Sequence, residues 1–179
     1  MDRIVVGVDG SAGSATALRW ALKVASETGA AVEAVHAWEF SYAWIDGYAP
    51  DVDRWAAQAE EEAHACLDRT IAEVVGSRPC YVDVTRTVVE GSPTRALLDH
   101  SKDADLLVVG TRGRGGFTGL LLGSVSQQCV HHAHVPVVVV PEPELLGPAA
   151  RRPVPPGGRA GQGSSGATPG STSRRRRRA

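Results

Sequence analysis

Apolar and polar positions along the chain follow two alternating patterns. Short runs of β-branched and other apolar residues recur, and longer stretches between them carry apolar residues at helical spacing. Apolar runs of this length are typical of parallel strands that are buried on both faces. Strands are therefore predicted at Arg3–Val8, Ala30–Trp38, Tyr81–Val89, Asp105–Gly110 and Val135–Pro141. Helices are predicted at Ser14–Thr28, Asp51–Val75, Pro93–Lys102 and Ser124–His132.

The regular alternation of strand and helix predicts an α/β domain, built as an open parallel sheet with helices on both faces. Right-handed crossovers leave few ways of ordering the strands. Gly29 is a fitting stop for the first helix, and Ser92 followed by Pro93 is a fitting start for the third. The longest helix is expected to face the sheet with a stripe made of Trp55, Ala59, Ala63, Leu67, Ile71 and Val74.

The loop between the fourth strand and the last helix carries regularly spaced glycines. Within Gly110–Ser124 (GTRGRGGFTGLLLGS), the residues Gly110, Gly113, Gly123 and Ser124 form the pattern G-x2-G-x9-G-S. Glycine can adopt positive φ, and without a Cβ it lets a ligand approach the backbone N–H groups closely. A loop that ends at a helix N-terminus also favours anions, so the pattern predicts binding of nucleotide phosphates. A solvent-facing connecting loop is the alternative.

Side chains near this loop add to the prediction. Ser124 stands where an N-cap would, so its hydroxyl is expected to cap the helix or to bind a phosphate oxygen. Arg112 and Arg114 add positive charge, although no lysine follows the second glycine as a Walker loop requires. Asp9, at the end of the first strand, is placed for a ribose hydroxyl or for a metal ion on the phosphates. The alternative role of Asp9 is to cap the next helix.

Three segments resemble the universal stress protein family. They are the glycine loop, the first strand with its turn, Ile4–Ser11 (IVVGVDGS), and the last strand, Val135–Val140 (VPVVVV). The resemblance is collinear from about Met1 to Pro141, and it implies a Rossmann-like sheet of five parallel strands in the order 3-2-1-4-5. In that order Asp9 and Gly110 face one crevice, although they lie about a hundred residues apart.

The resemblance also implies a ligand, which is ATP accompanied by Mg²⁺. In the family-based pose the adenine rests near His36 and Ala37, and Val8 and Asp9 hold the ribose. The positions implied to bind the nucleotide are Val8, Asp9, Ala37, Val109, Gly110, Arg112, Gly113, Gly123, Ser124, Val125 and Ser126. Similar proteins pair the last strand across a two-fold axis. A homodimer through Val135–Val140 is therefore expected, since a flat hydrophobic edge strand left bare would promote aggregation.

The resemblance implies an ATP-binding, nucleotide-dependent regulatory protein of the stress response. The glycine loop contains no candidate general base, and the chain has neither a Walker lysine nor a kinase catalytic motif. We therefore expect binding and regulation rather than catalysis. Slow ATP hydrolysis, or autophosphorylation at Thr118 or Ser124, is the enzymatic alternative.

Two further groups of side chains have a simpler explanation than a ligand site. A lone histidine has no catalytic partner, so His36 is expected to be packed or hydrogen-bonded. The cluster His131-His132-Ala133-His134 is explained by the favourable interaction of cations with a helix C-terminus rather than by a metal. The aromatic segment Phe40–Pro50 is expected to pack on the sheet edge, and a lid over a base is the alternative.

The net charge of −1 hides an asymmetry between two parts of the chain. Residues 147–179 contain eight arginines and no acid, which leaves 11 basic and 20 acidic residues in 1–146. Since the 147–179 segment is rich in Gly, Pro, Ser and Arg, we expect a disordered tail after a folded domain of residues 1–146. Arg174–Arg178 could bind nucleic acid, anionic lipid or the acidic domain itself. A nucleic-acid-associated adaptor is thus a further alternative function, and a merely solvated tail is the simpler explanation.

Cysteine usage and hydropathy bear on the compartment. Cys66, Cys80 and Cys129 are widely spaced and form no CxxC pair, so neither a disulfide framework nor a cysteine zinc site is indicated. The first strand begins at once, without a signal-peptide pattern in front of it, and no apolar run approaches the length needed to span a membrane. A cytoplasmic protein without a membrane partner is expected.

Overall fold

A computed structural model describes residues 1–40, 51–76, 81–113 and 122–142 of the chain. Five parallel strands form one sheet in the order β3-β2-β1-β4-β5, which confirms the predicted architecture. The strands are β1 (Arg3–Gly7), β2 (Ala31–Trp38), β3 (Val84–Glu90), β4 (Leu106–Gly110) and β5 (Val137–Val140). The helices are α1 (Ala12–Thr28), α2 (Val52–Val75), α3 (Pro93–Ser101) and α4 (Ser124–His132).

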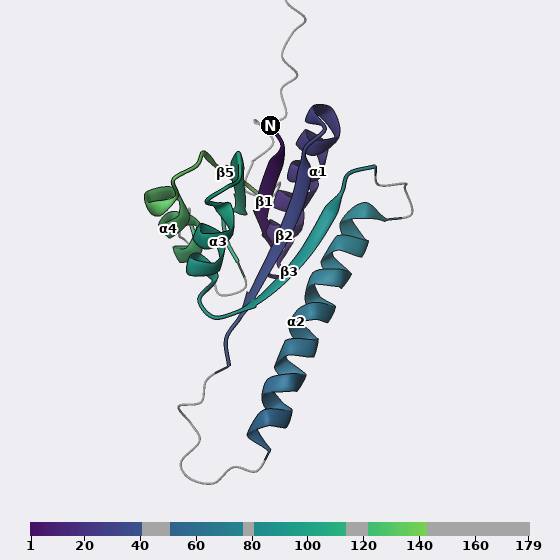
Figure 1. Cartoon of the computed structure of the whole chain (residues 1–179), viewed down its shortest axis with the longest axis vertical. Coiled ribbons are helices and arrows are strands. Elements are labelled where there is room, and N and C mark those ends of the chain that lie inside the picture. The colour runs from purple at the N-terminus through teal and green to yellow at the C-terminus, as the bar shows by residue number, and fades with distance from the viewer. Residues whose placement is uncertain (41–50, 77–80, 114–121, 143–179) are drawn as a thin grey trace, which may run out of the picture.

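Helices cover both faces of the sheet, with α1 and α2 on one side and α3 and α4 on the other (Figure 1). Each face has its own apolar core because alternate residues of a strand point to opposite faces. Along β1, Ile4 and Val6 pack with Leu18 of α1, whereas Val5 packs with Leu97 of α3. The central strands are therefore apolar on both sides, as their unbroken apolar runs predict.

Helix α1 begins two residues earlier than the sequence pattern predicts. Ser11 is its N-cap, and the Ser11 hydroxyl accepts a hydrogen bond of 3.1 Å from the backbone N–H of Ser14. At the other end Gly29 has φ 77°, the left-handed conformation that ends many helices, and its N–H donates to the Ala25 carbonyl. The glycine stop is confirmed, and the start was missed because Ala12 and Gly13 carry no apolar periodicity.

Helix α2 departs from its predicted inner stripe. Its second half is buried as expected, at Ala63, Leu67 and Ile71, but Trp55 is 48% exposed. In Figure 1 the first half of α2 extends beyond the carboxyl edge of the sheet, where none of the five described strands lies beneath it. Helical periodicity identifies one face of a helix but not how far the sheet underneath it reaches.

All five strands are shorter than predicted, and two of them start two or more residues late. Strand β3 starts at Val84 rather than at Tyr81, whose side chain is 92% exposed. Strand β5 starts at Val137 rather than at Val135, because Pro136 has no N–H with which to continue the ladder. Pro136 contributes only its carbonyl, which accepts a hydrogen bond from Leu107.

Two of the three cysteines lie in the described part of the chain. Cys66 and Cys129 are buried, and neither belongs to a disulfide. Burial raises the pKa of the Cys129 thiol to about 11, so this thiol stays protonated and unreactive near neutral pH. Cys80 lies outside the described residues.

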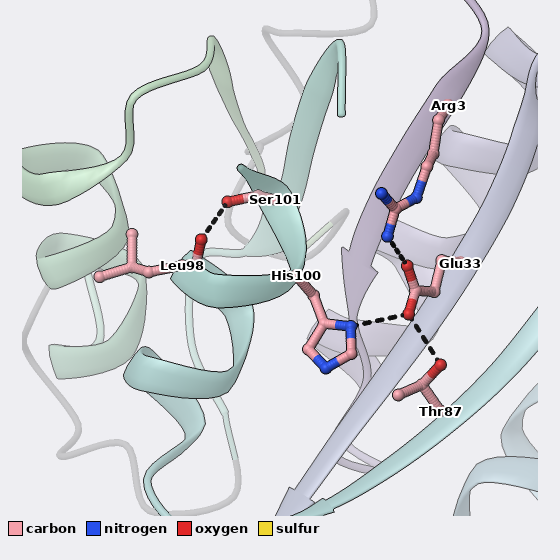
Figure 2. A network of polar contacts seen from close by, with 6 residues as sticks. All are labelled: Arg3, Glu33, Thr87, Leu98, His100 and Ser101. Carbon is pink, nitrogen blue, oxygen red and sulfur yellow. Dashed lines mark hydrogen bonds and ion pairs between the residues drawn. The ribbon is translucent and has the colours of Figure 1, made fainter. Parts of the chain in front are cut away.

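A buried carboxylate links three strands to α3 (Figure 2). Glu33 of β2 is 8% exposed. One of its oxygens pairs with the Arg3 guanidinium of β1, while the other accepts from the Thr87 hydroxyl of β3 at 2.8 Å and from His100 Nδ1 of α3 at 2.9 Å. Burial alone would raise the pKa of Glu33, but the hydrogen bonds from Arg3 and Thr87, together with the charges of Arg3 and His100, hold it below its ordinary value. The cluster thus stabilises an ionised carboxylate within the sheet.

Candidate functional site

A cavity of about 460 Å³ opens at the carboxyl ends of β1 and β4. This is the point where the strand order changes direction, the usual ligand position in open α/β sheets. All eleven positions selected from the sequence line this one cavity. The chain thus brings Asp9 and Gly110 together, as the strand order implies. Among the residues that sequence reasoning missed are Gly7, Ser14, Val35, Pro93 and Leu97, which also line the cavity.

The aspartate at the end of β1 holds the turn into α1. Oδ1 of Asp9 accepts hydrogen bonds from the backbone N–H of Ser11 at 3.0 Å and from its hydroxyl at 2.6 Å. The alternative in which Asp9 itself caps α1 is wrong, because Ser11 is the N-cap. Asp9 instead fixes the residue that caps the helix, and it lines the cavity as well.

The glycines of the loop allow close packing rather than unusual backbone angles. None of Gly110, Gly113 and Gly123 has a positive φ, so the expectation that conformational freedom explains them is wrong. A Cβ on Gly110 would stand 2.8 Å from the carbonyl carbon of Gly13 and 2.9 Å from its oxygen. A Cβ on Gly113 would collide with Oδ2 of Asp9. The absence of side chains therefore lets the end of β4 lie directly against the first turn of α1 and against Asp9.

The N-cap of helix α4 lies one residue earlier than predicted. Gly123 is the N-cap, with φ −72° and ψ 160°, and Ser124 is the first helical residue, so the prediction of Ser124 as the cap is wrong. The Gly123 N–H donates to the Thr111 carbonyl at 2.7 Å. The buried hydroxyl of Ser126 donates to the Gly110 carbonyl at 2.6 Å. These two bonds hold the N-terminus of α4, where backbone N–H groups lack helical partners, at the end of β4.

Arg112 is the basic side chain of the described cavity wall. Its Nη2 lies 3.6 Å from Oε2 of Glu142, just beyond the end of β5, and the two side chains are 23% and 20% exposed. The Nε of Arg112 is buried and has no acceptor among the described residues. An arginine with an unmet buried donor beside a cavity is suited to bind an oxygen-rich anion.

Another part of the cavity wall, from β2 and α3, is apolar. Val35, Ala37, Pro93 and Leu97 form this part of the wall. His36 points elsewhere: it is 6% exposed, and its Nδ1 donates to the Val8 carbonyl at 2.6 Å, since a carbonyl can only accept. The expectation that His36 is packed or hydrogen-bonded is confirmed. The contribution of α3 could have been suspected from Pro93 and Leu97, which lie four residues apart on one helix face.

The described residues include no group of three or more histidines, cysteines or acidic residues that could hold a metal ion. His131 and His132 lie in the last turn of α4, where positive charge is favourable. No helix in the described ranges is long and apolar enough to cross a membrane. The predictions on Arg114, on Thr118, on residues 41–50 of the aromatic segment and on the tail of residues 147–179 concern residues outside the described part.

Comparison with known proteins gives consistent matches. Universal stress protein Rv2005c of Mycobacterium tuberculosis is 42% identical over 139 residues, which make up 76% of this chain and 44% of that protein. Universal stress protein Rv2623 of the same organism is 36% identical over 142 residues, or 78% of this chain and 45% of that protein. The chain therefore spans about half the length of these curated relatives.

Solved structures agree on the fold. The universal stress protein UspA from Lactobacillus plantarum superimposes with a TM-score of 0.64 at 21% identity, covering 78% of this chain and 97% of that one. A universal stress protein in complex with cAMP gives a TM-score of 0.50 at 25% identity, covering 79% and 97%. The family model of the universal stress protein family matches residues 1–141. The chain therefore belongs to the universal stress protein family.

Proposed function

We propose that this protein binds ATP, with Mg²⁺, in the cavity at the ends of β1 and β4, and that it acts as a nucleotide-dependent regulatory protein of the stress response in the cytoplasm. One observation carries the proposal: the eleven positions named from the sequence, spread from Val8 to Ser126, line a single cavity. The volume of about 460 Å³ lies in the range of small-ligand sites. The related structure in complex with cAMP supports an adenine nucleotide as the ligand class.

The two ends of the cavity suit the two ends of a nucleotide. An adenine would lie against the apolar part of the wall near Ala37, with the ribose at Val8 and Asp9. The phosphates would meet Arg112 and the N-terminus of α4, where helix dipole and unpaired N–H groups favour negative charge. Because Gly123 has no side chain, phosphate oxygens can approach the backbone at the helix start.

The fit of Mg²⁺ rests on Asp9. Magnesium prefers oxygen ligands and is usually held by one or two carboxylates together with substrate phosphates and water. Asp9 is the acidic side chain of the described cavity wall, and it would complete the coordination of a metal carried on the phosphates. The ion would neutralise phosphate charge beside this carboxylate.

Binding without efficient turnover fits the side chains present. Oδ1 of Asp9 already accepts two hydrogen bonds from Ser11, so this oxygen is engaged in holding the turn into α1. Phosphate release or autophosphorylation that disappears in both Asp9→Ala and Ser124→Ala would establish the enzymatic alternative. Release that survives both substitutions would come from a contaminating enzyme.

Replacing Arg112 with glutamine tests the proposed site directly. We expect native protein to bind Mg·ATP in calorimetry and Arg112→Gln to bind at least tenfold more weakly, since a charge-assisted bond to phosphate is lost and Glu142 is left unpaired. Arg19→Gln, on the exposed face of α1, removes the same charge away from the cavity and should bind like the native chain. Absence of binding by the folded native protein would contradict the proposal, and equal weakening by both variants would argue against this cavity.

We also propose a homodimer paired through the Val135–Val140 segment. β5 is an edge strand, and three of its four residues, Val137, Val138 and Val139, are only half-buried in the single chain. A second copy would cover both the unpaired backbone and this apolar surface. Sedimentation equilibrium should therefore give twice the chain mass, and a monomer across the micromolar range would contradict the dimer.

A further inference from the structure

Glu142 lies where the ends of β4, β5 and α1 meet. It follows β5 after one proline, and its Oε2 is 3.6 Å from Nη2 of Arg112. Its other oxygen, Oε1, lies 2.8 Å from the place that a Cβ on Gly13 would occupy. The carboxylate therefore rests over the first turn of α1, where the helix dipole favours a negative charge, and beside the arginine of the cavity.

The contact between Glu142 and Arg112 is an ion pair rather than a close hydrogen bond. At 3.6 Å it is longer than the usual N–H···O distance, and Nε of Arg112 has no acceptor in the described part of the chain. Arg112 thus retains donors for a ligand, while the charge of Glu142 cancels part of its attraction for anions. Both side chains are about four-fifths buried, so solvent and salt screen this effect only weakly.

We propose that Glu142 is a specificity-determining residue, which lowers the preference of the cavity for nucleotides with longer phosphate chains. The proposal rests on the proposed nucleotide site. Each phosphate beyond the first adds about one negative charge near neutral pH. Repulsion by a fixed carboxylate grows with that charge, and Glu142 lies behind Arg112, where the phosphates would accumulate. The Glu142 carboxylate therefore weakens the binding of a nucleoside monophosphate least and that of a triphosphate most.

Glu142 lies one residue beyond the stretch that matches the family model, which ends at residue 141. It reaches the cavity arginine because Gly13 leaves room for it. Together with Asp9, it gives two carboxylates and one arginine among the described residues in and beside the cavity.

Calorimetry with AMP, ADP and ATP tests the proposal, first without Mg²⁺ and then with it. Glu142→Gln should raise the ratio of the ATP to the AMP association constant by about tenfold, with ADP intermediate and with the smallest increase in binding for AMP. The increase should persist in 0.5 M salt, because the pair is largely buried. Glu73→Gln, an exposed position on α2, removes the same charge far from the cavity and should leave the ratio unchanged.

Each other outcome overturns the proposal in a recognisable way. An unchanged ratio would mean that Glu142 does not discriminate by charge, and a lowered ratio would mean that it positions Arg112 for the phosphates instead. Equal weakening of all three nucleotides would indicate a structural role. Failure of the folded native chain to bind any of the three would remove the nucleotide site itself, together with this inference.

Discussion

Substituting Gly110 with alanine is expected to lower the free energy of unfolding by about 3 kcal/mol and to abolish the proposed nucleotide binding, because the added methyl group meets backbone rather than a movable side chain. The Cβ would stand 2.8 Å from the carbonyl carbon of Gly13 and 3.3 Å from the backbone nitrogen of Ser14. Neither atom can move without shifting the first turn of α1. The clash of the added Cβ with the backbone of Gly13 can therefore be relieved only if β4 and α1 separate. That separation would disrupt the wall of the cavity.

Gly123→Ala is the matched control for this substitution. It adds the same methyl group to the same loop, but the nearest atom is the Thr111 carbonyl oxygen at 3.4 Å, an ordinary contact, and φ is −72°. Urea unfolding should show a change of less than about 1 kcal/mol for Gly123→Ala. Similar stabilities for the two variants would show that the contact between Gly110 and Gly13 is not tight in solution.

Glu33→Gln should destabilise the protein by about 2 kcal/mol at pH 7, since Arg3 and His100 then lose their shared negative partner inside the fold. Removing one member of a fully buried pair costs about 3–5 kcal/mol. The side chain of Arg3 is 37% exposed, so water recovers part of that loss. Glu27→Gln, which breaks an exposed pair with Lys23, should change stability by less than about 0.5 kcal/mol.

The effect of Glu33→Gln should depend on pH in one direction. The pKa of Glu33 in the folded protein lies below its ordinary value of 4.5, so folding favours the charged form. This contribution to stability is complete above the unfolded pKa and is lost as the pH falls through the folded one. Urea titrations should therefore show a difference between native and Glu33→Gln that is constant from pH 6 to 7 and shrinks towards pH 3. A difference that grows on acidification would contradict the assigned charge state.

The strand order and the position of the cavity followed from the sequence because they depend on features that repeat along the chain. Apolar runs marked all five strands, and the resemblance supplied their order. That order alone brings Asp9 and Gly110 to one edge of the sheet. Residues contributed by α3 were missed, because Leu97 reaches the cavity only through the way that α3 packs on β1.

Details that depend on tertiary contact could not be predicted. Serine is a favoured helix cap, yet Gly123 takes that place at α4 because its N–H bonds to the Thr111 carbonyl. The predicted inner stripe of α2 wrongly included Trp55, which is about half exposed, because periodicity does not indicate where the sheet under the helix ends. The pairing of Arg112 with Glu142 joins two loops that sequence spacing cannot relate.

The placement of β1 between β2 and β4 has a consequence for the order of folding. β1 and β2 are near neighbours in sequence, but Ile4 also pairs with Leu106, across most of the folded chain. Pairings of such long range close late, since the entropy of a large loop must first be overcome. A nascent chain that has made only β1, α1 and β2 thus contains six of the sixteen residues named as lining the cavity, and neither Arg112 nor the N-terminus of α4. A nucleotide that contacts residues at the ends of both β1 and β4 would chiefly slow unfolding rather than speed folding, because it binds only after the slowest pairing has formed.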